Sequence, residues 1–132
     1  MKTLVVEPGK APYRKEIDSD LKALQHEVGG LIQALYPFED EVAIICNDEG
    51  KLHNLPPNRF LYDEEGNAYN LIAGTFLVVG LTEDDFGSLT EKQIEFYTEL
   101  YADPPNIEQE LARLQNTFRK KIKFAFINAF HI

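Results

Sequence analysis

Two apolar segments rich in branched side chains lie next to each other near the middle of the sequence. They cover residues 31–38 and 42–47, and only three acidic residues, 39–41, separate them. Adjacent apolar runs joined by a short polar turn are typical of neighbouring β-strands. We therefore predict that these two strands form the centre of a sheet and that the rest of the chain packs around them.

Four further segments have the pattern of strands: residues 3–6, 13–17, 67–72 and 74–79. Pro8-Gly9, which suits a turn, separates the first two, so they are predicted to pair as a hairpin. Gly74, within the apolar run that ends at Gly80, indicates a bulge or a place where another group comes close to the backbone. These segments and the central pair together predict a mostly antiparallel sheet of about five or six strands.

Two segments carry the signals of short helices. Asp18-Ser19-Asp20 offers N-cap oxygens for the first helix, and Gly29 stands where a left-handed C-terminal cap is expected. Thr90 and Gln93 form a capping box at the start of the second helix, which ends before Asp103-Pro-Pro. The apolar stripes are Leu21, Leu24 and Val28 in the first helix and Ile94, Tyr97 and Tyr101 in the second.

A long helix is predicted at the C-terminal end. Asn106 and Gln109 repeat the capping spacing, and the apolar residues that follow step by three and four. These residues are Ile107, Leu111, Leu114, Phe118, Ile122 and Phe126. The expected fold class is therefore α+β: a single domain in which two or three helices pack on the antiparallel sheet, with a long C-terminal helix.

The composition is that of a globular protein, 44% hydrophobic with six Tyr and nine Phe. No run approaches the ~20 apolar residues that span a bilayer, and Glu7-Pro8 interrupts the first apolar run too early for a signal peptide. We therefore expect no membrane association and a cytoplasmic location. The single cysteine, Cys46, excludes an internal disulfide.

Charge is divided unevenly along the chain. The net charge is −9, but residues 1–110 hold all 22 acids and eight bases and so carry −14, whereas residues 111–132 hold five bases and no acid. The bases Arg119, Lys120, Lys121 and Lys123 lie late in the last helix, where the helix dipole favours cations. On a strongly acidic protein, such bases are expected to contact the protein's own acidic face or a second copy rather than nucleic acid directly.

The C-terminal end carries more apolar surface than one helix end usually hides. The residues concerned are Phe124, Phe126, Ile127, Phe130 and Ile132. Removing each such side chain from water is worth roughly 1.5–3 kcal/mol, so a homo-oligomer formed through this helix is expected.

The segment Leu55–Arg59 offers the most promising candidate chemistry. Its two prolines favour either an extended link or the first turn of a short helix that runs to Leu61. A guanidinium beside amides suits a phosphate group or a planar base, and tyrosines would add stacking faces. The candidate ligand-binding residues are Asn54, Asn58, Arg59, Tyr13, Tyr36 and Tyr69. In the alternative interpretation, Asn58 caps a short helix and Arg59 pairs with one of the abundant carboxylates.

No catalytic or metal site is expected. Cys46 shares a predicted strand face with Val42 and Ile44, which favours a buried, inert thiol over a nucleophile. The acidic runs 39–41, 63–65 and 83–85 fall in turns, where carboxylates are solvated rather than paired for acid–base catalysis. The three histidines, which form no ligand pair at helical spacing, are His26, His53 and His131. No cofactor is therefore expected, and an enzyme ranks behind a binding protein.

A collinear series of short motifs runs through residues 1–102. The motifs are Met1–Lys10 with Tyr13 and Ile17, Leu24-Gln25 leading to Val28-Gly29-Gly30, Tyr36-Pro37-Phe38, Asn47–Lys51, Leu55–Arg59, Ile72–Phe76, and Leu89-Thr90 with Gln93. In these motifs the chain resembles the DUF3846 family. That family has no assigned function and occurs in bacteriophages and other mobile elements, so the resemblance implies a setting in a bacterial host cytoplasm. Residues 103–132 look like an addition to this core.

Two hypotheses follow for the function. In the first, the protein is a non-enzymatic binding module that captures a small phosphorylated or nucleotide-like ligand beside Asn58 and Arg59, with a counter-defence role that only the family context suggests. In the second, the acidic surface engages and inhibits a basic host protein, as DNA-mimicking antirestriction proteins do. The charge of −14 over residues 1–110 motivates the second hypothesis.

Overall fold

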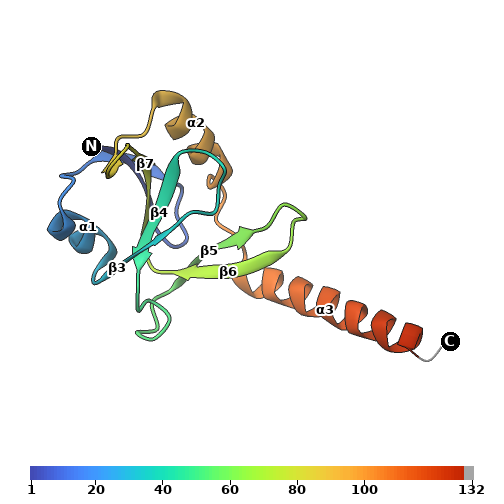
Figure 1. The fold of residues 1–132 in the computed structure, drawn as a ribbon. Helices are drawn as coiled ribbons and strands as arrows, with labels where there is room; N and C mark the ends of the chain where they lie inside the picture. The colour runs from blue at the N-terminus through green and yellow to red at the C-terminus, as the bar shows by residue number, and fades with distance from the viewer. Residues whose placement is uncertain (130–132) are drawn as a thin grey trace.

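The structure is a computed structural model that describes residues 1–129, with side chains described as far as Lys123. This part of the chain forms two antiparallel β-sheets, two short helices and one long helix (Figure 1). The predicted α+β class, the mostly antiparallel sheet and the long C-terminal helix are confirmed. Outside the described part lie Phe130, His131 and Ile132 and the side chains of Phe124, Phe126 and Ile127.

The larger sheet has the strand order β2-β1-β7-β4-β3, and the short β8 pairs with β7. The strands are β1 (Lys2–Val6), β2 (Tyr13–Glu16), β3 (Ile32–Leu35), β4 (Val42–Asn47), β7 (Phe76–Leu81) and β8 (Phe86–Gly87). Every neighbouring pair is antiparallel. The predicted hairpin near the N-terminus is β1 with β2, and the two apolar segments near the middle of the sequence pair as β3 with β4.

The prediction that β3 and β4 form the centre of the sheet is wrong in one respect. β3 is an edge strand, and β7 is the central one, between β1 and β4. β1, β4 and β7 are almost entirely buried, whereas no residue of β3 is fully buried. A strand covered on both faces is a near-continuous apolar run, but its place in the sheet depends on distant segments that local composition does not encode.

Both faces of the larger sheet are covered. The helices are α1 (Leu21–Val28), α2 (Glu91–Leu100) and α3 (Ile107–Ala129), and the smaller sheet consists of β5 (Pro57–Tyr62) and β6 (Ala68–Ala73). On one face, Leu24 and Val28 of α1 pack over Ile45 and Leu77. On the other face, α2 and the smaller sheet enclose a second core around Tyr97. Alternation of side chains along β4 and β7 supplies both cores from the same strands.

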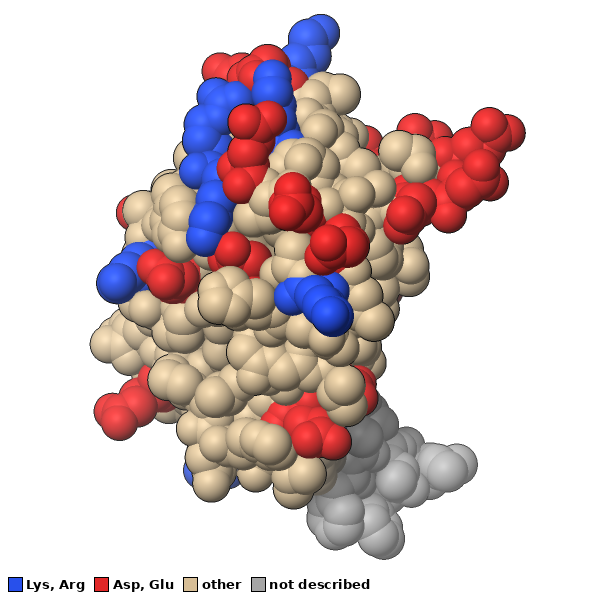
Figure 2. Space-filling view, turned by 90° about the vertical axis from the view of Figure 1, so that its left-hand side faces the viewer, with Lys and Arg blue, Asp and Glu red and all other residues tan. Residues whose placement is uncertain are grey.

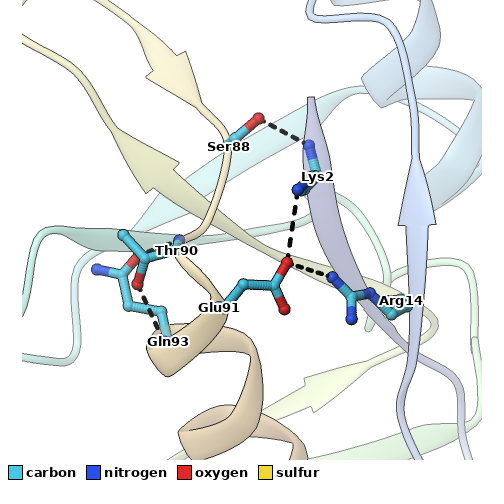
Figure 3. A network of polar contacts seen from close by, with 6 residues as sticks. All are labelled: Lys2, Arg14, Ser88, Thr90, Glu91 and Gln93. Atoms are coloured by element: carbon cyan, nitrogen blue, oxygen red, sulfur yellow. Dashed lines mark hydrogen bonds and ion pairs between the residues drawn. The ribbon is translucent and has the colours of Figure 1, made fainter.

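The predicted helix ends are confirmed by their hydrogen bonds. Asp20 Oδ1 accepts from the backbone N–H of Ala23 at 2.8 Å, and Gly29 has the left-handed φ of 78°. Thr90 and Gln93 form the reciprocal capping box, shown in Figure 3. Asn106 Oδ1 accepts from the backbone N–H of Gln109 at 3.0 Å at the start of α3.

The start of α2 is also tied to the N-terminal hairpin. One carboxylate oxygen of Glu91 accepts from Lys2 Nζ at 3.4 Å and from Arg14 Nη2 at 2.7 Å (Figure 3). The backbone N–H of Lys2 donates to Ser88 Oγ at 2.9 Å. These contacts link β1 and β2 to the segment that enters α2.

The segment Leu55–Arg59 does not begin a short helix. It enters β5 at Pro57, and β5 pairs with β6 in the two-stranded sheet, where proline at the first strand position is tolerated. The register shifts between Pro57 and Arg59, so the strand bulges at Asn58. Gly74 has a φ of 83°, and a Cβ there would come within 2.8 Å of Leu55 Cδ1, which confirms the predicted close approach.

α3 extends away from the two sheets, and its first half runs past the β5–β6 hairpin (Figure 1). Tyr62 donates its hydroxyl to Glu110 at 3.0 Å, and Lys121 Nζ donates to Asn67 Oδ1 at 3.4 Å. Glu110 also forms an ion pair with Arg113. One side of the helix therefore contacts the hairpin.

Candidate functional site

Asn58 and Arg59, the centre of the predicted ligand site, lie inside the protein. Asn58 is 1% exposed, and its Nδ2 donates to the carbonyl oxygens of Val6 at 2.8 Å and Gly74 at 2.9 Å. Arg59 is 3% exposed, and its Nη1 donates to Asn58 Oδ1 at 2.8 Å. The bulge in β5 thus turns the amide inward, where it joins β1 to the loop before β7.

The guanidinium of Arg59 contacts main-chain oxygens rather than a carboxylate. Its Nη2 donates to the carbonyl oxygens of Lys10 and Tyr101, each at 2.7 Å. Burial lowers the pKa of Arg59, and its Nε is buried with no hydrogen-bond partner among the described residues. The alternative interpretation, in which Asn58 caps a helix and Arg59 pairs with an acid, is therefore wrong in both respects. Arg59 connects the turn after β1, β5 and the end of α2.

The other predicted ligand-binding residues lie apart from one another on the surface. Tyr13 is on the edge strand β2, and Tyr36 follows β3 at the opposite edge of the larger sheet. Tyr69 is on β6, and Asn54 stands in the loop before β5 with a positive φ of 54°. Of the six candidates, the hydrogen bonds bring together Asn58 and Arg59.

A surface hollow with apolar walls and an acidic rim lies between α2, the β3–β4 loop and the tip of the β5–β6 hairpin. Its volume is about 500 Å³. We call this cavity the acidic hollow. The residues that line it are Pro37, Phe38, Glu39, Asp40, Glu64, Phe96 and Tyr97. Three segments far apart in sequence thus supply three carboxylates and three aromatic rings to one place.

The aromatic rings of the acidic hollow are packed against one another. The ring of Tyr97 lies 4.9 Å, centroid to centroid, from that of Phe38 and also from that of Phe96. Tyr97 is buried, whereas Phe96 is 59% exposed and presents its ring to the surface. Such an exposed aromatic side chain on a polar helix face is a feature of contact surfaces.

Hydrogen bonds fix one of the three carboxylates. Asp40 accepts from the Tyr97 hydroxyl at 3.0 Å and from Gln93 Nε2 at 3.1 Å. Burial, followed by the hydrogen bond to Asp40, raises the pKa of Tyr97, so the phenol stays protonated and donates. Glu39 and Glu64 are exposed and form no ion pair within the described part of the chain. The arrangement suits a cation that carries an apolar stem.

The remaining sequence expectations about chemistry concern single residues. Cys46 is buried and 5% exposed, as predicted, and burial raises the pKa of its thiol. Among the described residues, no group of three or more His, Cys, Asp or Glu side chains could hold a metal ion. No described helix has the length and apolar character needed to cross a bilayer.

Sequence reasoning identified the acidic runs but not their neighbours in the hollow. The runs 39–41, 63–65 and 83–85 are exposed, as predicted. The residues that the sequence did not indicate are the aromatic ones, above all Phe96. Phe96 lies on the polar side of α2, outside the apolar stripe that contains Ile94 and Tyr97. That position was the available signal, because an aromatic outside the buried stripe of an amphipathic helix has no core to fill.

These features define the class of the protein: a small α+β domain of two antiparallel sheets with an acidic surface hollow, extended by an amphipathic helix. The chain belongs to the family described as a domain of unknown function, DUF3846, whose sequence model matches residues 1–102. Neither the curated proteins nor the solved structures include a match to the chain.

Proposed function

We propose that the protein is a non-enzymatic binding module that engages a Lys- and Arg-rich segment of another protein through its acidic surface. The central contact is the acidic hollow. The observation that supports this proposal most is that one hollow combines an exposed ring, Phe96, with the carboxylates of Glu39 and Glu64, which form no ion pair with any described side chain. The long side chains of Lys and Arg match this combination, because an apolar stem carries a cationic head.

The charge of the family-matched region supports the same partner chemistry. Residues 1–102 hold nineteen acids and eight bases, which gives −11. Four of these bases are held in ion pairs by three acids, Glu7, Glu27 and Glu91. Nineteen less three leaves sixteen acids without a Lys or Arg partner within the described side chains. In Figure 2 most basic side chains on the face that carries α1 lie beside acidic ones, while a group of acidic side chains projects from its edge.

The fit of a cationic side chain to the acidic hollow follows from its walls. The stem of a Lys or Arg side chain would pack on the rings of Phe38 and Phe96, and the head would reach the carboxylates of Glu39 and Glu64. A cation over an aromatic face gains about 0.5–1 kcal/mol at an exposed site. Several such contacts along a basic segment would combine with long-range attraction to the acidic domain.

The proposal extends to a biological setting. In a phage or mobile element, a module of this kind would act in the bacterial host cytoplasm and inhibit a basic host protein, such as one that normally binds DNA. The support for this setting is the family resemblance and the acidic surface, which presents negative charge to a protein built to bind phosphates.

Binding of a fluorescein-labelled peptide that alternates Lys, Arg and Leu tests the proposal. Fluorescence anisotropy with the full chain should give saturable binding that weakens steeply from low to moderate salt, because exposed charges are screened. The variant Glu39→Gln/Glu64→Gln should weaken binding about tenfold, the sum of two exposed charge contacts.

A matched control removes the same charge elsewhere. Glu83→Gln/Asp84→Asn changes two exposed acids of the turn at 83–85, which does not line the acidic hollow, and should weaken binding less than about threefold. Equal losses in the two variants would show that the peptide responds to net charge alone. No binding at low salt would overturn the proposal.

The small anionic ligand remains a second proposal. Its support is the pair of donors at Asn58 and Arg59 and the unpartnered Nε of Arg59. We place it second because both terminal nitrogens of Arg59 already donate to protein oxygens. Calorimetry of the full chain with cyclic dinucleotides and ADP-ribose tests it, and a saturable heat lost in Arg59→Lys but not in Lys51→Ala would move it to first place.

Self-association through residues 103–132 completes the proposal. Its support is the exposure of large apolar side chains on the described part of α3, with Phe118 at 64%. A homo-oligomer would remove them from water and present more than one acidic hollow to a partner with repeated basic segments.

A further inference from the structure

α3 carries a line of apolar side chains that remain exposed. Leu111, Phe118 and Ile122 are 41%, 64% and 53% exposed. At 100° of rotation per residue, the three side chains lie within about 40° of one another around the helix axis. The hairpin contacts a different side of α3, through Glu110 and Lys121, which lie about a quarter turn around the helix axis from the apolar line.

We propose that this line pairs with the same line of a second copy, with the two α3 helices antiparallel and the two-fold axis between Leu114 and Gln115. The inference rests on the self-association proposed above and is independent of the acidic hollow. In this register Leu111 packs beside Phe118 of the second copy, and Ile107 packs beside Ile122 of the second copy. The contact is therefore closed and uses the same patch twice, as a two-fold dimer requires.

Charges beside the apolar line favour this orientation. Glu108 and Arg119 flank the same side of the line, at about 60° and 80° from its centre. Neither forms an ion pair within the described residues. In the antiparallel pair, Glu108 lies on the same flank of the contact as Arg119 of the second copy, about 3 Å from its level along the helix axis. A parallel pair would place the two residues on opposite flanks and about 16 Å apart along the axis.

The charge of the domains favours the same orientation. A parallel pair would bring two domains of −11 to the same end of the helix pair. In the antiparallel register the first residues of the two α3 helices lie 15 residues apart along the helix axes, or roughly 22 Å, which exceeds the Debye length at physiological salt. The antiparallel pair also brings the bases of residues 111–132 toward the acidic domain of the second copy.

Sedimentation equilibrium of the full chain tests the pairing. We expect a species of twice the 15.1 kDa chain mass in the wild type. Phe118→Glu should raise the dimer dissociation constant at least tenfold, because it places a charge in the apolar line. Asn116→Glu, which adds the same charge on the opposite side of the helix, should leave the constant within about threefold.

A charge exchange tests the orientation. Glu108→Arg and Arg119→Glu should each weaken the dimer, and the double variant Glu108→Arg/Arg119→Glu should restore it, since only antiparallel helices place these positions opposite each other. A monomeric wild type, equal effects of Phe118→Glu and Asn116→Glu, or no restoration by the double variant would each overturn the inference. Peptide binding by the Phe118→Glu monomer reports on the acidic hollow separately, so the two proposals fail independently.

Discussion

The buried side chain of Arg59 joins segments that are far apart in the sequence. A guanidinium next to an asparagine on a proline-rich segment predicts an outward-facing anion site. In the structure it donates to Asn58, Lys10 and Tyr101 and holds three distant segments together. The stability of the fold depends on this buried cation, because buried main-chain oxygens that lose their hydrogen-bond donor lower the free energy of unfolding.

Arg59→Ala should therefore lower the free energy of unfolding by about 3 kcal/mol or more, since it leaves two carbonyl oxygens and the Asn58 amide oxygen without their charged donor. Urea denaturation measures the change. Arg14→Ala, which removes an exposed arginine that pairs with Glu91, is the control and should cost less than about 1 kcal/mol. Equal stability of the Arg59→Ala protein and the wild type would contradict this role.

The sequence could not have shown what Arg59 contacts. The chemistry of its side chain marks Arg59 as a candidate, but the main-chain oxygens that it binds, those of Lys10 and Tyr101, lie 49 and 42 residues away in the chain. The two prolines of the segment Leu55–Arg59 are compatible with an extended or a helical backbone. Pairing with β6 makes the segment a strand from Pro57 onward. The neighbouring sequence does not distinguish a buried arginine from an exposed one. The burial of Arg59 follows only from the packing of the two sheets.

Among the elements, the helices could be predicted best because their signals are local. The caps at Asp20, Gly29 and Thr90 each depend on residues within one turn, and each is present. Sheet order could not be predicted, because β7 reaches the centre by pairing with β1, seventy or more residues earlier. The acidic hollow needed the same long-range information, since its residues come from three elements.

The ion pairs that fix α2 against the N-terminal hairpin make a pH-dependent prediction. The hydrogen bond from Arg14 is the largest cause that holds the pKa of Glu91 below its ordinary value, with Lys2 adding to it. A depressed folded-state pKa contributes stability above the unfolded-state pKa, and this contribution is lost as the pH falls through the folded-state value. Because Glu91 is exposed, the contribution is small.

Carboxylate NMR of Glu91 measures the effect directly. In Arg14→Ala its pKa should move up toward the ordinary value, and Lys22→Ala, which removes a cation that does not contact Glu91, should leave it unchanged. An unchanged pKa in Arg14→Ala would show that the contact in Figure 3 does not persist in solution.

The protein as a unit has an acidic domain and a basic, apolar helix. Residues 1–102 belong to DUF3846, and α3 follows this domain. In the proposed dimer, α3 would pair two copies, and each copy would present an acidic hollow. The contrast in charge between the two parts is visible in the sequence, whereas the place where rings and carboxylates meet depends on the fold.

A ¹H–¹⁵N NMR titration of the Phe118→Glu monomer with the unlabelled Lys/Arg/Leu peptide locates the binding surface directly. If the peptide binds in the acidic hollow, the largest shift changes, at saturating peptide and moderate salt, will fall on the backbone amides of Phe38, Glu64, Phe96 and their neighbours. Shift changes spread evenly over the acidic turns, or centred on Asn54 and Tyr69, would contradict it.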